Sequence, residues 1–565
     1  MERPWYKHWP LGVPKSMDYP RIPLHQLLRD TAKGHGTIPA TVFYGKKLTY
    51  AEIDDQADRF AAGLRRMGVR KGDRIGIVLP NSPMYMIAFF GALRAGAVVV
   101  PTNPLYTPRE LEELYRDSGA TVVVTLDLFL PNVLKAKPNT MIQHVVVSDV
   151  KEYLPRLLGW LYPIKKKKDL KKAGHWPLVI PEEPWVHRFA ELLEAAPQPG
   201  EEPAVDVDAD VAVLQYTGGT TGTPKGAMLT HMNLVANTHQ GAAWIPSAMP
   251  GDRTLAAIPM FHVFGLTVGL LASVKLAATI VLHPNPRETG HILKLITKTR
   301  PSIFPGVPTM YVAILNHPKL RKAKLHGIRA CLSGAAPLPR EIRRRFEQLT
   351  GGRLVEGYGL TEASPITHAN PLTEEGLVKE CIGIPMPDTD AKVVDQETGT
   401  RELPVGEAGE LIVSGPQVMK GYWGKKDETE AVLLAGWLYT GDIAKVDEDG
   451  YFHIVERKKD MIIASGYNVY PREVEEVLFT HPAVQEAAVV GLPDVHRGET
   501  VKAFLVLKPG AAANAEEILA FCRERLAAFK VPKAVEFRTE LPKSLVGKVL
   551  RRALREEGLT HQRIR

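Results

Sequence analysis

The sequence predicts an α/β protein with a large N-terminal domain of helix-covered, mainly parallel sheets and a small α+β C-terminal domain. At 565 residues the chain exceeds what one hydrophobic core supports, so we expect two or more domains. Strand and helix patterns alternate through the first part of the chain, which indicates parallel strands covered by helices. This alternation stops near Glu-Arg-Lys-Lys-Asp at 456–460. We therefore expect domains at 1–457 and 458–565.

Two helix starts stand out in the first part. Thr49-Tyr-Ala-Glu52 is a capping box that predicts a helix ending near Met67, before Gly68. Thr107-Pro-Arg-Glu110 is a second capping box, with proline at the first helical position. Around them we expect strands at 74–79, 97–101 and 121–125, and an apolar helix at 84–95.

The same alternation resumes after residue 211. Strands are expected at 255–258, 278–282, 302–304, 328–332 and 353–356. In the C-terminal domain we expect helices at 472–480 and 516–527 and strands at 485–490 and 501–507. In sheets of this kind ligands bind at the carboxyl ends of the strands, so motifs that follow strands are the candidates for function.

One such motif is a glycine- and threonine-rich loop. Residues 216–226 read Tyr-Thr-Gly-Gly-Thr-Thr-Gly-Thr-Pro-Lys-Gly and follow a β-type run at 211–216. Glycines let backbone N–H groups turn inward, hydroxyls donate hydrogen bonds and lysine adds a point charge, which suits a polyphosphate. The loop of kinases and GTPases needs Gly-Lys-Ser/Thr, whereas here Pro224 precedes Lys225 and Gly226 follows it. The alternative interpretation is a flexible surface turn.

Five further motifs follow in order along the chain. They are Pro259-Met-Phe-His262, Ser333-Gly-Ala-Ala336, Glu356-Gly-Tyr-Gly-Leu-Thr-Glu362, Tyr439-Thr-Gly-Asp442 and Leu541-Pro-Lys-Ser-Leu-Val-Gly-Lys548. With the glycine-threonine loop they make the chain resemble the adenylate-forming superfamily, and acyl-CoA synthetases in particular, over nearly its whole length. The segment 103–111, Asn-Pro-Leu-Tyr-Thr-Pro-Arg-Glu-Leu, and a lysine-rich insertion make it most similar to bacterial long-chain fatty-acid–CoA ligases.

The resemblance implies a two-step ligase of fatty acid and lipid metabolism that uses ATP, Mg²⁺ and coenzyme A. A carboxylate first attacks the α-phosphate of ATP, which gives acyl-AMP and pyrophosphate. The thiol of coenzyme A then displaces AMP and forms a thioester. Such chemistry needs mainly positioning and charge stabilisation from the protein.

The resemblance also assigns roles to residues that bind the nucleotide and the metal. The loop that holds the β- and γ-phosphates would comprise Thr217, Gly218, Gly219, Thr220, Thr221, Gly222 and Lys225. Glu362 would ligate Mg²⁺, since this hard cation takes oxygen ligands, and Thr361 would bond the α-phosphate. The adenine site would comprise Gly334, Ala335, Ala336, Glu356, Gly357, Tyr358 and Gly359. Asp442 and Arg457 would contact the ribose.

Catalysis and domain movement are assigned in the same way. Lys548 would stabilise charge between the carboxylate and the α-phosphate in the first step, whereas Lys543 would be peripheral. The C-terminal domain would be mobile and pivot at Lys459. Ser465, Gly466 and Tyr467 would then line the pantetheine tunnel. Glu456 departs from the pattern, because a glycine usually stands there, and puts the details of the hinge in question.

His262 and the apolar residues after it resemble the wall of the acyl pocket. Val263 to Leu266 could line a tunnel, with Gly306 leaving space opposite them; ordinary packing of an apolar helix is the alternative. His262 has no partners at metal-ligand spacing and is not expected to bind zinc. A medium-chain or aryl-acid ligase is the alternative function, with a shorter pocket. A non-catalytic binding protein of the same fold is a further alternative, disfavoured because Lys548, Glu362 and Asp442 are all retained.

The net charge of +8 is concentrated in one place. Residues 165–172 hold six lysines and one aspartate, a local charge of +5, and follow the apolar run 154–164, which contains Trp160 and Tyr162. This insertion, at about 150–190, is typical of a segment that contacts an anionic membrane surface; a solvated loop is the alternative. Pro155, Gly159 and Pro163 would weaken any helix here. Without a basic stripe elsewhere, nucleic acid is not an expected partner.

The cysteine content and the apolar runs of the sequence indicate the cell compartment. Three widely separated cysteines, Cys331, Cys381 and Cys522, give no disulfide framework and favour a reducing cytoplasm. The first ten residues do not resemble a signal peptide, and the longest near-apolar run, 263–274, is too short to cross a bilayer. We therefore expect a cytoplasmic protein, peripheral on the inner face of the cell membrane, that could form a homodimer.

Overall fold

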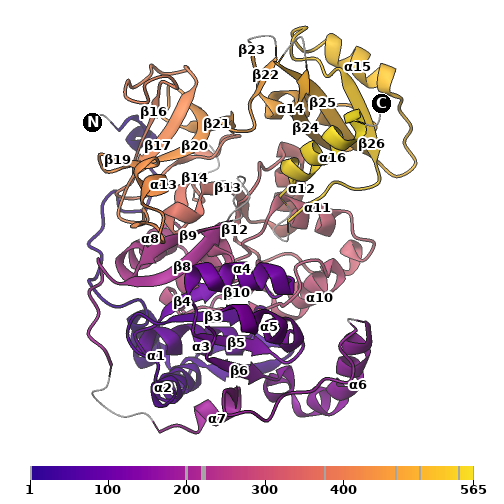
Figure 1. Cartoon of the computed structure of the whole chain (residues 1–565). Helices are drawn as coiled ribbons and strands as arrows, with labels where there is room; N and C mark the ends of the chain where they lie inside the picture. Colours follow the sequence, from indigo (N-terminus) through magenta and orange to yellow (C-terminus); the bar gives the residue numbers. More distant parts are fainter. Residues whose placement is uncertain are drawn as a thin grey trace.

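The computed structural model describes residues 3–172, 174–196, 202–217, 224–373, 377–464, 467–494, 498–544 and 548–563. Its largest sheet has eight strands in the order β18-β9-β8-β4-β3-β5-β6-β7 (Figure 1). The strands are β3 (Arg74–Val78), β4 (Val98–Pro101), β5 (Val122–Leu126), β6 (His144–Ser148), β7 (Val186–Arg188), β8 (Val211–Thr217), β9 (Lys225–Thr230) and β18 (Gly421–Tyr422). Strands β8, β4, β3, β5, β6 and β7 pair in parallel, whereas β9 and β18 are antiparallel additions at one edge.

Helices cover this sheet, and both predicted capping boxes are confirmed. Thr49 and Thr107 each accept a hydrogen bond from the backbone of the glutamate three residues later, and Pro108 occupies the first turn. The helices of this region are η1 (Pro4–His8), α1 (Gln26–His35), α2 (Tyr50–Arg66), α3 (Pro83–Arg94), α4 (Pro108–Ser118), α5 (Leu130–Ala136), η2 (Lys137–Asn139), η3 (Val150–Tyr153), α6 (Arg156–Lys172) and α7 (Phe189–Leu193). Every residue of α3 is buried, because this helix lies inside the domain rather than at its surface.

A second layer is built from two four-stranded sheets, β10-β11-β1-β2 and β12-β13-β14-β15. The strands are β1 (Pro39–Phe43), β2 (Lys46–Thr49), β10 (Arg253–Ala256), β11 (Thr279–Leu282), β12 (Ala330–Ser333), β13 (Arg353–Gly359), β14 (Ile366–Ala369) and β15 (Ile384–Pro385). The strand expected at 302–304 is a single bridging residue, Ile303, which pairs with Thr254 on one side and Ala330 on the other. Pro301 and Pro305 flank it and lack the N–H that a longer ladder needs.

The helices of the second layer include one of unusual geometry. They are α8 (His231–Ala243), η4 (Gly265–Leu271), α9 (Ala272–Lys275), α10 (Thr289–Thr299), α11 (Pro308–Leu315), η5 (Leu320–Lys322), α12 (Arg340–Thr350) and η6 (Thr361–Ala363). The apolar helix expected after His262 is present, and its residues Gly265–Leu271, η4, form a π-helix. Single turns of π-helix are rare and are frequent at functional sites.

The third sheet is antiparallel, which the strand–helix alternation did not anticipate. Its strands are β16 (Asp390–Val394), β17 (Gly409–Ser414), β19 (Leu433–Leu434), β20 (Trp437–Val446) and β21 (Phe452–Arg457), with the short helix α13 (Lys426–Glu430) beside them. The strands follow each other through short turns, which antiparallel pairing allows and parallel pairing does not.

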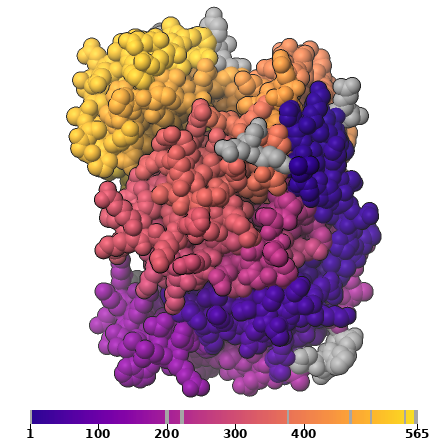
Figure 2. Space-filling model, turned by 180° about the vertical axis from the view of Figure 1, so that it is seen from behind, coloured from indigo at the N-terminus to yellow at the C-terminus, as the bar shows by residue number. Residues whose placement is uncertain are grey.

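The residues after β21 form an α+β unit with its own apolar core, as predicted. The unit contains β22 (Ile462–Ala464), β23 (Tyr467–Val469), α14 (Pro471–Phe479), β24 (Val484–Asp494), β25 (Gly498–Leu507), α15 (Ala515–Arg523), β26 (Ala534–Arg538) and α16 (Arg551–Arg563). Val474, Leu478, Val489 and Leu505 are among the buried residues that pack together here. Figures 1 and 2 show this unit, in yellow, at one end of the molecule.

The basic insertion forms a helix despite the residues expected to weaken one. Residues Arg156–Lys172 form α6, with Pro163 inside it. The proline ring opposes the carbonyl four residues earlier, and that residue is Gly159, whose lack of a side chain lets the backbone adjust there. Lys166 holds the helix to the domain through ion pairs with Asp127 and Asp149. In the part of the chain that the structure describes, no helix combines the length and hydropathy needed to cross a membrane.

Candidate active site

The hairpin β8–β9 presents the glycine-threonine loop. Thr217 and Lys225, which flank the loop, are the last paired residues of the two strands. Gly218, Gly219, Thr220, Thr221 and Gly222 lie outside the described residues. The Lys225 Nζ atom lies 5.2 Å from the centre of the Tyr422 ring, a cation–π distance. The lysine at the base of the loop is therefore held by an aromatic side chain from the neighbouring strand β18.

The same tyrosine connects the loop to Glu362. The Tyr422 hydroxyl donates a 2.7 Å hydrogen bond to Glu362 Oε1, and the backbone N–H of Met419 donates to the Glu362 carbonyl. Burial, and next the charge of Glu362, raise the pKa of Tyr422 well above its ordinary value. Glu362 is half-buried, and among the described residues its Oε2 atom accepts no hydrogen bond. A carboxylate oxygen that stays available beside a phosphate-type loop fits a hard cation such as Mg²⁺.

Two predicted motifs meet at one edge of the second layer. β12 and β13 pair in parallel with Ser333 opposite Glu356, so the Gly334–Ala336 and Gly357–Gly359 segments leave the sheet together. At Gly359 a side chain would meet the Pro365 carbonyl oxygen at 2.1 Å, so only glycine fits. The N–H of Leu338 donates a 3.0 Å bond to Glu356, whose pKa burial raises to about 7. Thr361 follows on η6, in the same turn as Glu362.

Tyr358, Asp442 and Arg457 are brought together from two different sheets. The Tyr358 hydroxyl donates a short hydrogen bond to Asp442 Oδ2, and Arg457 Nε lies 3.5 Å from Asp442 Oδ1. Asp442 and Arg457 are opposite each other on β20 and β21, which fixes the second contact. Asp442 is buried, at 7% exposure. This carboxylate is therefore held in place before any nucleotide hydroxyl reaches it.

Lys548 lies on a tight loop of the C-terminal unit that faces this group. The Ser544 N–H donates to the Lys548 carbonyl at 2.8 Å, and the Lys548 N–H donates to Ser544 Oγ at 3.2 Å. Burial, and next the charges of Arg457 and Lys459, lower the pKa of Lys548 to about 7. Lys543, expected to be peripheral, pairs instead with Glu486 at 2.6 Å.

His262 lies within reach of the Lys548 charge. Burial, and next that charge, lower the pKa of His262 to about 4, and its Nδ1 atom accepts a 3.2 Å hydrogen bond from the Phe264 N–H. Because the Lys548 charge affects the pKa of His262, the motif that follows β10 and the motif near the C-terminus lie close together. A positive group of Lys548, Arg457 and Lys459 thus faces the predicted nucleotide position.

Next to the predicted pivot, Glu456 stands where a glycine is expected and forms bonds that glycine could not. Glu456, 3% exposed, accepts a 2.7 Å hydrogen bond from the Arg472 N–H and lies 3.3 Å from Arg551. Arg551 on α16 also pairs with Asp460 and Glu475. Ser465 and Gly466 lie outside the described residues, and of Tyr467 only the backbone, at the start of β23, is described. Glu456 is therefore bound to residues on the far side of Lys459.

An apolar cavity lies in the second layer, beside the motif that follows β12. Its walls come from α8, η4, α9 and the strands of the second layer: Gly241, Trp244, Ile245, Thr254, Val268, Ala272, Ser273, Leu276, Ile303, Pro305, Ala330, Cys331, Leu332, Ile366, Ala369, Leu372 and Met386. None of Val263 to Leu266 lines it. Gly306 leaves no space, since the Tyr311 ring lies 2.6 Å from where a side chain would begin. The acyl-pocket wall at Val263 to Leu266 stays a prediction.

The comparisons with known proteins agree with this architecture. The chain matches the model of the AMP-binding enzyme family over residues 28–423 and that of the AMP-binding enzyme C-terminal domain over 473–548. A long-chain-fatty-acid–CoA ligase of Bacillus subtilis (strain 168) is 48% identical over 575 residues and covers 100% of both chains.

Solved structures also match over nearly the whole chain. A crystal structure of the anthranilate CoA ligase AuaEII in complex with anthranoyl-AMP aligns with TM-score 0.83 and 28% identity, over 96% of this chain and 98% of that one. A crystal structure of ATP-bound MatB from Rhodopseudomonas palustris aligns with TM-score 0.81 and 29% identity, over 95% and 99%. The predicted resemblance and fold class are confirmed, and the chain belongs to the AMP-binding enzyme family.

Proposed function

We propose that this protein is an AMP-forming long-chain-fatty-acid–CoA ligase. It would convert a fatty acid and ATP to acyl-AMP and pyrophosphate, and then acyl-AMP and coenzyme A to acyl-CoA and AMP. The observation that carries the proposal is the convergence of Lys548, His262, Asp442 and Arg457 from two structural units on one site. The full-length similarity to a long-chain ligase supports the choice of substrate.

In the proposed first step the chain's own groups bind and neutralise ATP. Thr217, Lys225 and the glycine-threonine loop between them hold the β- and γ-phosphates, which leave as pyrophosphate. Glu362 offers its free oxygen to Mg²⁺, and the metal would supply further positive charge at the phosphates. Asp442 accepts hydrogen bonds from the ribose hydroxyls, with Arg457 beside it. The adenine lies between Tyr358 and the backbone at Gly334–Ala336.

Lys548 would act where two anions approach each other. An ammonium group beside the α-phosphate stabilises the charge that develops as the carboxylate attacks. Burial is the main cause of its lowered pKa, and among the nearby charges Asp442 and Asp460 oppose Arg457 and Lys459. Bound phosphates add negative charge, which favours the protonated form.

For the second step we propose that the unit beyond residue 457 rotates about Lys459. This removes Lys548 and brings Ser465, Gly466 and Tyr467 to the channel for the coenzyme A arm. The separate apolar core of 458–565 supports a domain boundary at this point, because a unit with its own core can move as a body.

The general test of this function is an assay series. Pyrophosphate release is measured with fatty acids of graded length and with benzoate, each with and without coenzyme A. We expect release to need ATP and Mg²⁺, to be greatest with long chains and to turn over only with coenzyme A. Highest activity with benzoate or a medium-chain acid would replace the proposal by the alternative ligase of the same fold.

The apolar cavity is the proposed site of the acyl chain. Ala272 forms part of its wall on α9, 4% exposed. We expect Ala272→Phe to fill the cavity, and to lower kcat/KM for hexadecanoate about tenfold or more while octanoate is little affected, since a few methylenes in an apolar pocket are worth such factors. Steady-state kinetics with the two acids measure this. Equal losses with both acids would contradict the placement of the acyl chain here.

We further propose that α6 contacts an anionic membrane surface on the cytoplasmic side. Leu157, Trp160 and Ile164 are 70, 76 and 72% exposed. Five exposed lysines stand on the same helix: Lys165, Lys167, Lys168, Lys171 and Lys172. Figures 1 and 2 show α6 at the edge of the molecule farthest from the C-terminal unit, where nothing obstructs it. Apolar side chains beside lysines bind an anionic lipid surface through both burial and charge.

Replacing Leu157, Trp160 and Ile164 together with serine should weaken binding to vesicles of anionic lipid by about tenfold or more. The lysines stay, so the loss measures the apolar contribution, and turnover of octanoate should be unchanged. Vesicle sedimentation at fixed lipid concentration is the measurement. Met249→Ser removes an exposed apolar residue elsewhere, 65% exposed, and is the control. Equal binding by the triple variant and the control would refute membrane contact through α6.

A homodimer remains a prediction from the resemblance, and light scattering at working concentration tests it.

A further inference from the structure

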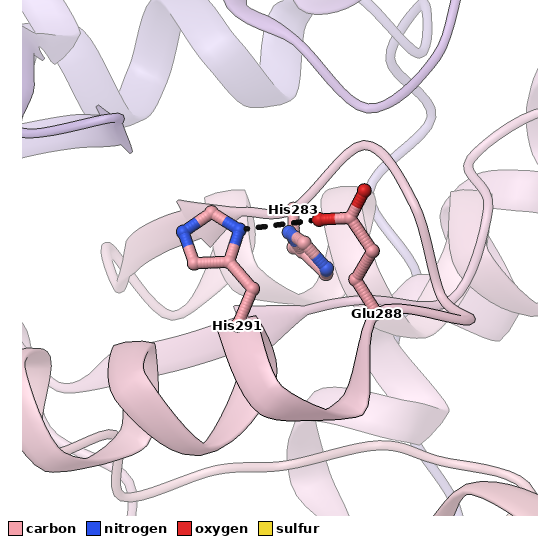
Figure 3. Close-up of side chains that lie close together, drawn as sticks. All are labelled: His283, Glu288 and His291. Atoms are coloured by element: carbon pink, nitrogen blue, oxygen red, sulfur yellow. Dashed lines mark ion pairs between the residues drawn. The ribbon is translucent and has the colours of Figure 1, made fainter.

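Three side chains with metal-ligating atoms converge at the start of α10 (Figure 3). His283 directly follows β11, Glu288 precedes α10 and His291 lies in its first turn. One ligand atom from each lies within 4.8 Å of the other two. The short connection from β11 to α10 makes the cluster, because it returns the chain over the end of the strand that carries His283. None of the three has a part in the ligase mechanism proposed above.

His283 is the unusual member of this cluster. Its side chain is fully buried, at 0% exposure, and among the described residues neither ring nitrogen forms a hydrogen bond of normal geometry, although the nearby backbone of Asn285 opposes the lowering of its pKa. A buried polar group without a partner is costly, commonly about 1–3 kcal/mol, so native proteins rarely leave one unexplained. Burial, and next the charge of His291, lower the pKa of His283 to about 4, which keeps the ring neutral and its lone pair available at pH 7. An unseen ligand at this ring would account for the arrangement.

The other two residues face His283 from the surface side. His291 Nδ1 lies 3.7 Å from Glu288 Oε2, and the rings of His291 and His283 meet edge to face with centroids 4.8 Å apart. Asn285 donates a 3.1 Å hydrogen bond to the other Glu288 oxygen, Oε1. Partners of this kind orient a ligating carboxylate. Figure 3 shows the His283 ring next to the line between His291 and Glu288.

We propose that His283, Glu288 and His291 bind a divalent transition-metal ion, with Zn²⁺ as the best match. Two imidazoles and one carboxylate suit Zn²⁺, whereas Mg²⁺ prefers oxygen ligands alone. Three protein ligands leave a fourth position for water. Tetrahedral zinc with bonds of 2.0–2.1 Å places its ligand atoms about 3.4 Å apart, so the cluster has to contract by about 1 Å. Glu288 is exposed and His291 half-buried, so both side chains have room to move toward the fixed His283.

Two positive charges act against the site. Lys294, one turn further along α10, and Lys165, on α6, both lower the pKa of His291, for which burial is the larger cause and Glu288 an opposing one. Tyr44 stacks on the His291 ring at 5.7 Å and covers its other side. The lysines repel a cation as they repel a proton. Lys165→Ala removes one of these charges and should strengthen Zn²⁺ binding here severalfold.

The test compares zinc binding by the chelator-treated full chain and its variants. The wild-type chain should bind one equivalent of Zn²⁺ more tightly than His291→Ala and Glu288→Gln by at least tenfold, measured by titration against a competing indicator. Co²⁺ bound to the wild-type chain should give visible absorption bands of a four-coordinate site that the two variants lose. Millimolar Mg²⁺ should not displace either ion.

Control variants show whether Zn²⁺ binds at this site rather than at other histidines, and whether the site variants stay folded. His35→Ala removes an exposed histidine elsewhere and should bind Zn²⁺ like the wild type. His291→Ala and Glu288→Gln alter side chains that reach the surface, and pyrophosphate release with Mg²⁺ should remain near the wild-type rate in both. Zinc affinity and cobalt absorption equal to the wild type in both variants would overturn the proposal, as would a wild-type chain that takes up no Zn²⁺.

Discussion

Replacing Lys548 with alanine should lower the rate of acyl-AMP formation by about 10³-fold, the loss found when one preorganised charge or donor is removed from a transition state. The ammonium group would lie where a carboxylate approaches the α-phosphate, close to the charges of Arg457 and Lys459. Thioester formation from supplied acyl-AMP and coenzyme A should stay within a few fold of the wild-type rate. Single-turnover measurements of the two half-reactions distinguish these outcomes.

Lys543→Ala is the matched control for this variant. Lys543 lies on the same loop, but its ammonium pairs with Glu486 on β24 and is directed away from the site. We expect its adenylation rate to stay within a few fold of wild type. If Lys548→Ala slowed both half-reactions equally, or if Lys543→Ala matched its effect on adenylation, Lys548 would not be the first-step catalyst.

Replacing Glu362 with glutamine should lower kcat/KM for ATP by about 10²-fold at low Mg²⁺ concentration, and high Mg²⁺ should restore part of the loss. Glutamine preserves the size of the side chain and can still accept the hydrogen bond from Tyr422, so the main change is the loss of negative charge. The Mg²⁺ dependence of pyrophosphate release is the measurement.

Tyr422→Phe isolates the positioning of that carboxylate. It leaves the Glu362 charge in place and keeps an aromatic ring under Lys225, but removes the 2.7 Å hydrogen bond. We expect a smaller loss than for Glu362→Gln and a weaker dependence on Mg²⁺. A Glu362→Gln enzyme with the wild-type Mg²⁺ requirement would exclude Glu362 as the metal ligand.

Local signals in the sequence predicted much of the fold. The capping boxes at Thr49 and Thr107 depend only on residues three apart, and both form as expected. The pairing of β12 with β13 brings two motifs to one edge, as the rule for parallel strands requires. The sequence is less informative at Pro163, because the residues that offset its effect on the helix lie elsewhere. This proline weakens a helix, but Gly159 and the ion pairs of Lys166 allow α6 to form.

The residues missed at the site are those without a local signal. Tyr422 lies on a two-residue strand, and its contacts with Lys225 and Glu362 arise only because β18 pairs with β9. The cavity is lined from α8, η4 and α9 together, so no single stretch of sequence outlines it. The π-helical turn η4 also shifts the positions that face inward, which explains why Val268 lines the cavity and Val263 does not.

The bonds of Glu456 across the pivot have an energetic consequence for the order of the two steps. The proposed rotation about Lys459 has to part this buried carboxylate from Arg551 and from the Arg472 N–H. Leaving a buried charge without its partner commonly costs about 3–5 kcal/mol. Where glycine stands at this position, no such cost arises. If the proposed rotation leaves Glu456 buried, the resting population of this chain would be biased toward the arrangement seen here, and the release of pyrophosphate or the arrival of coenzyme A would have to supply the difference.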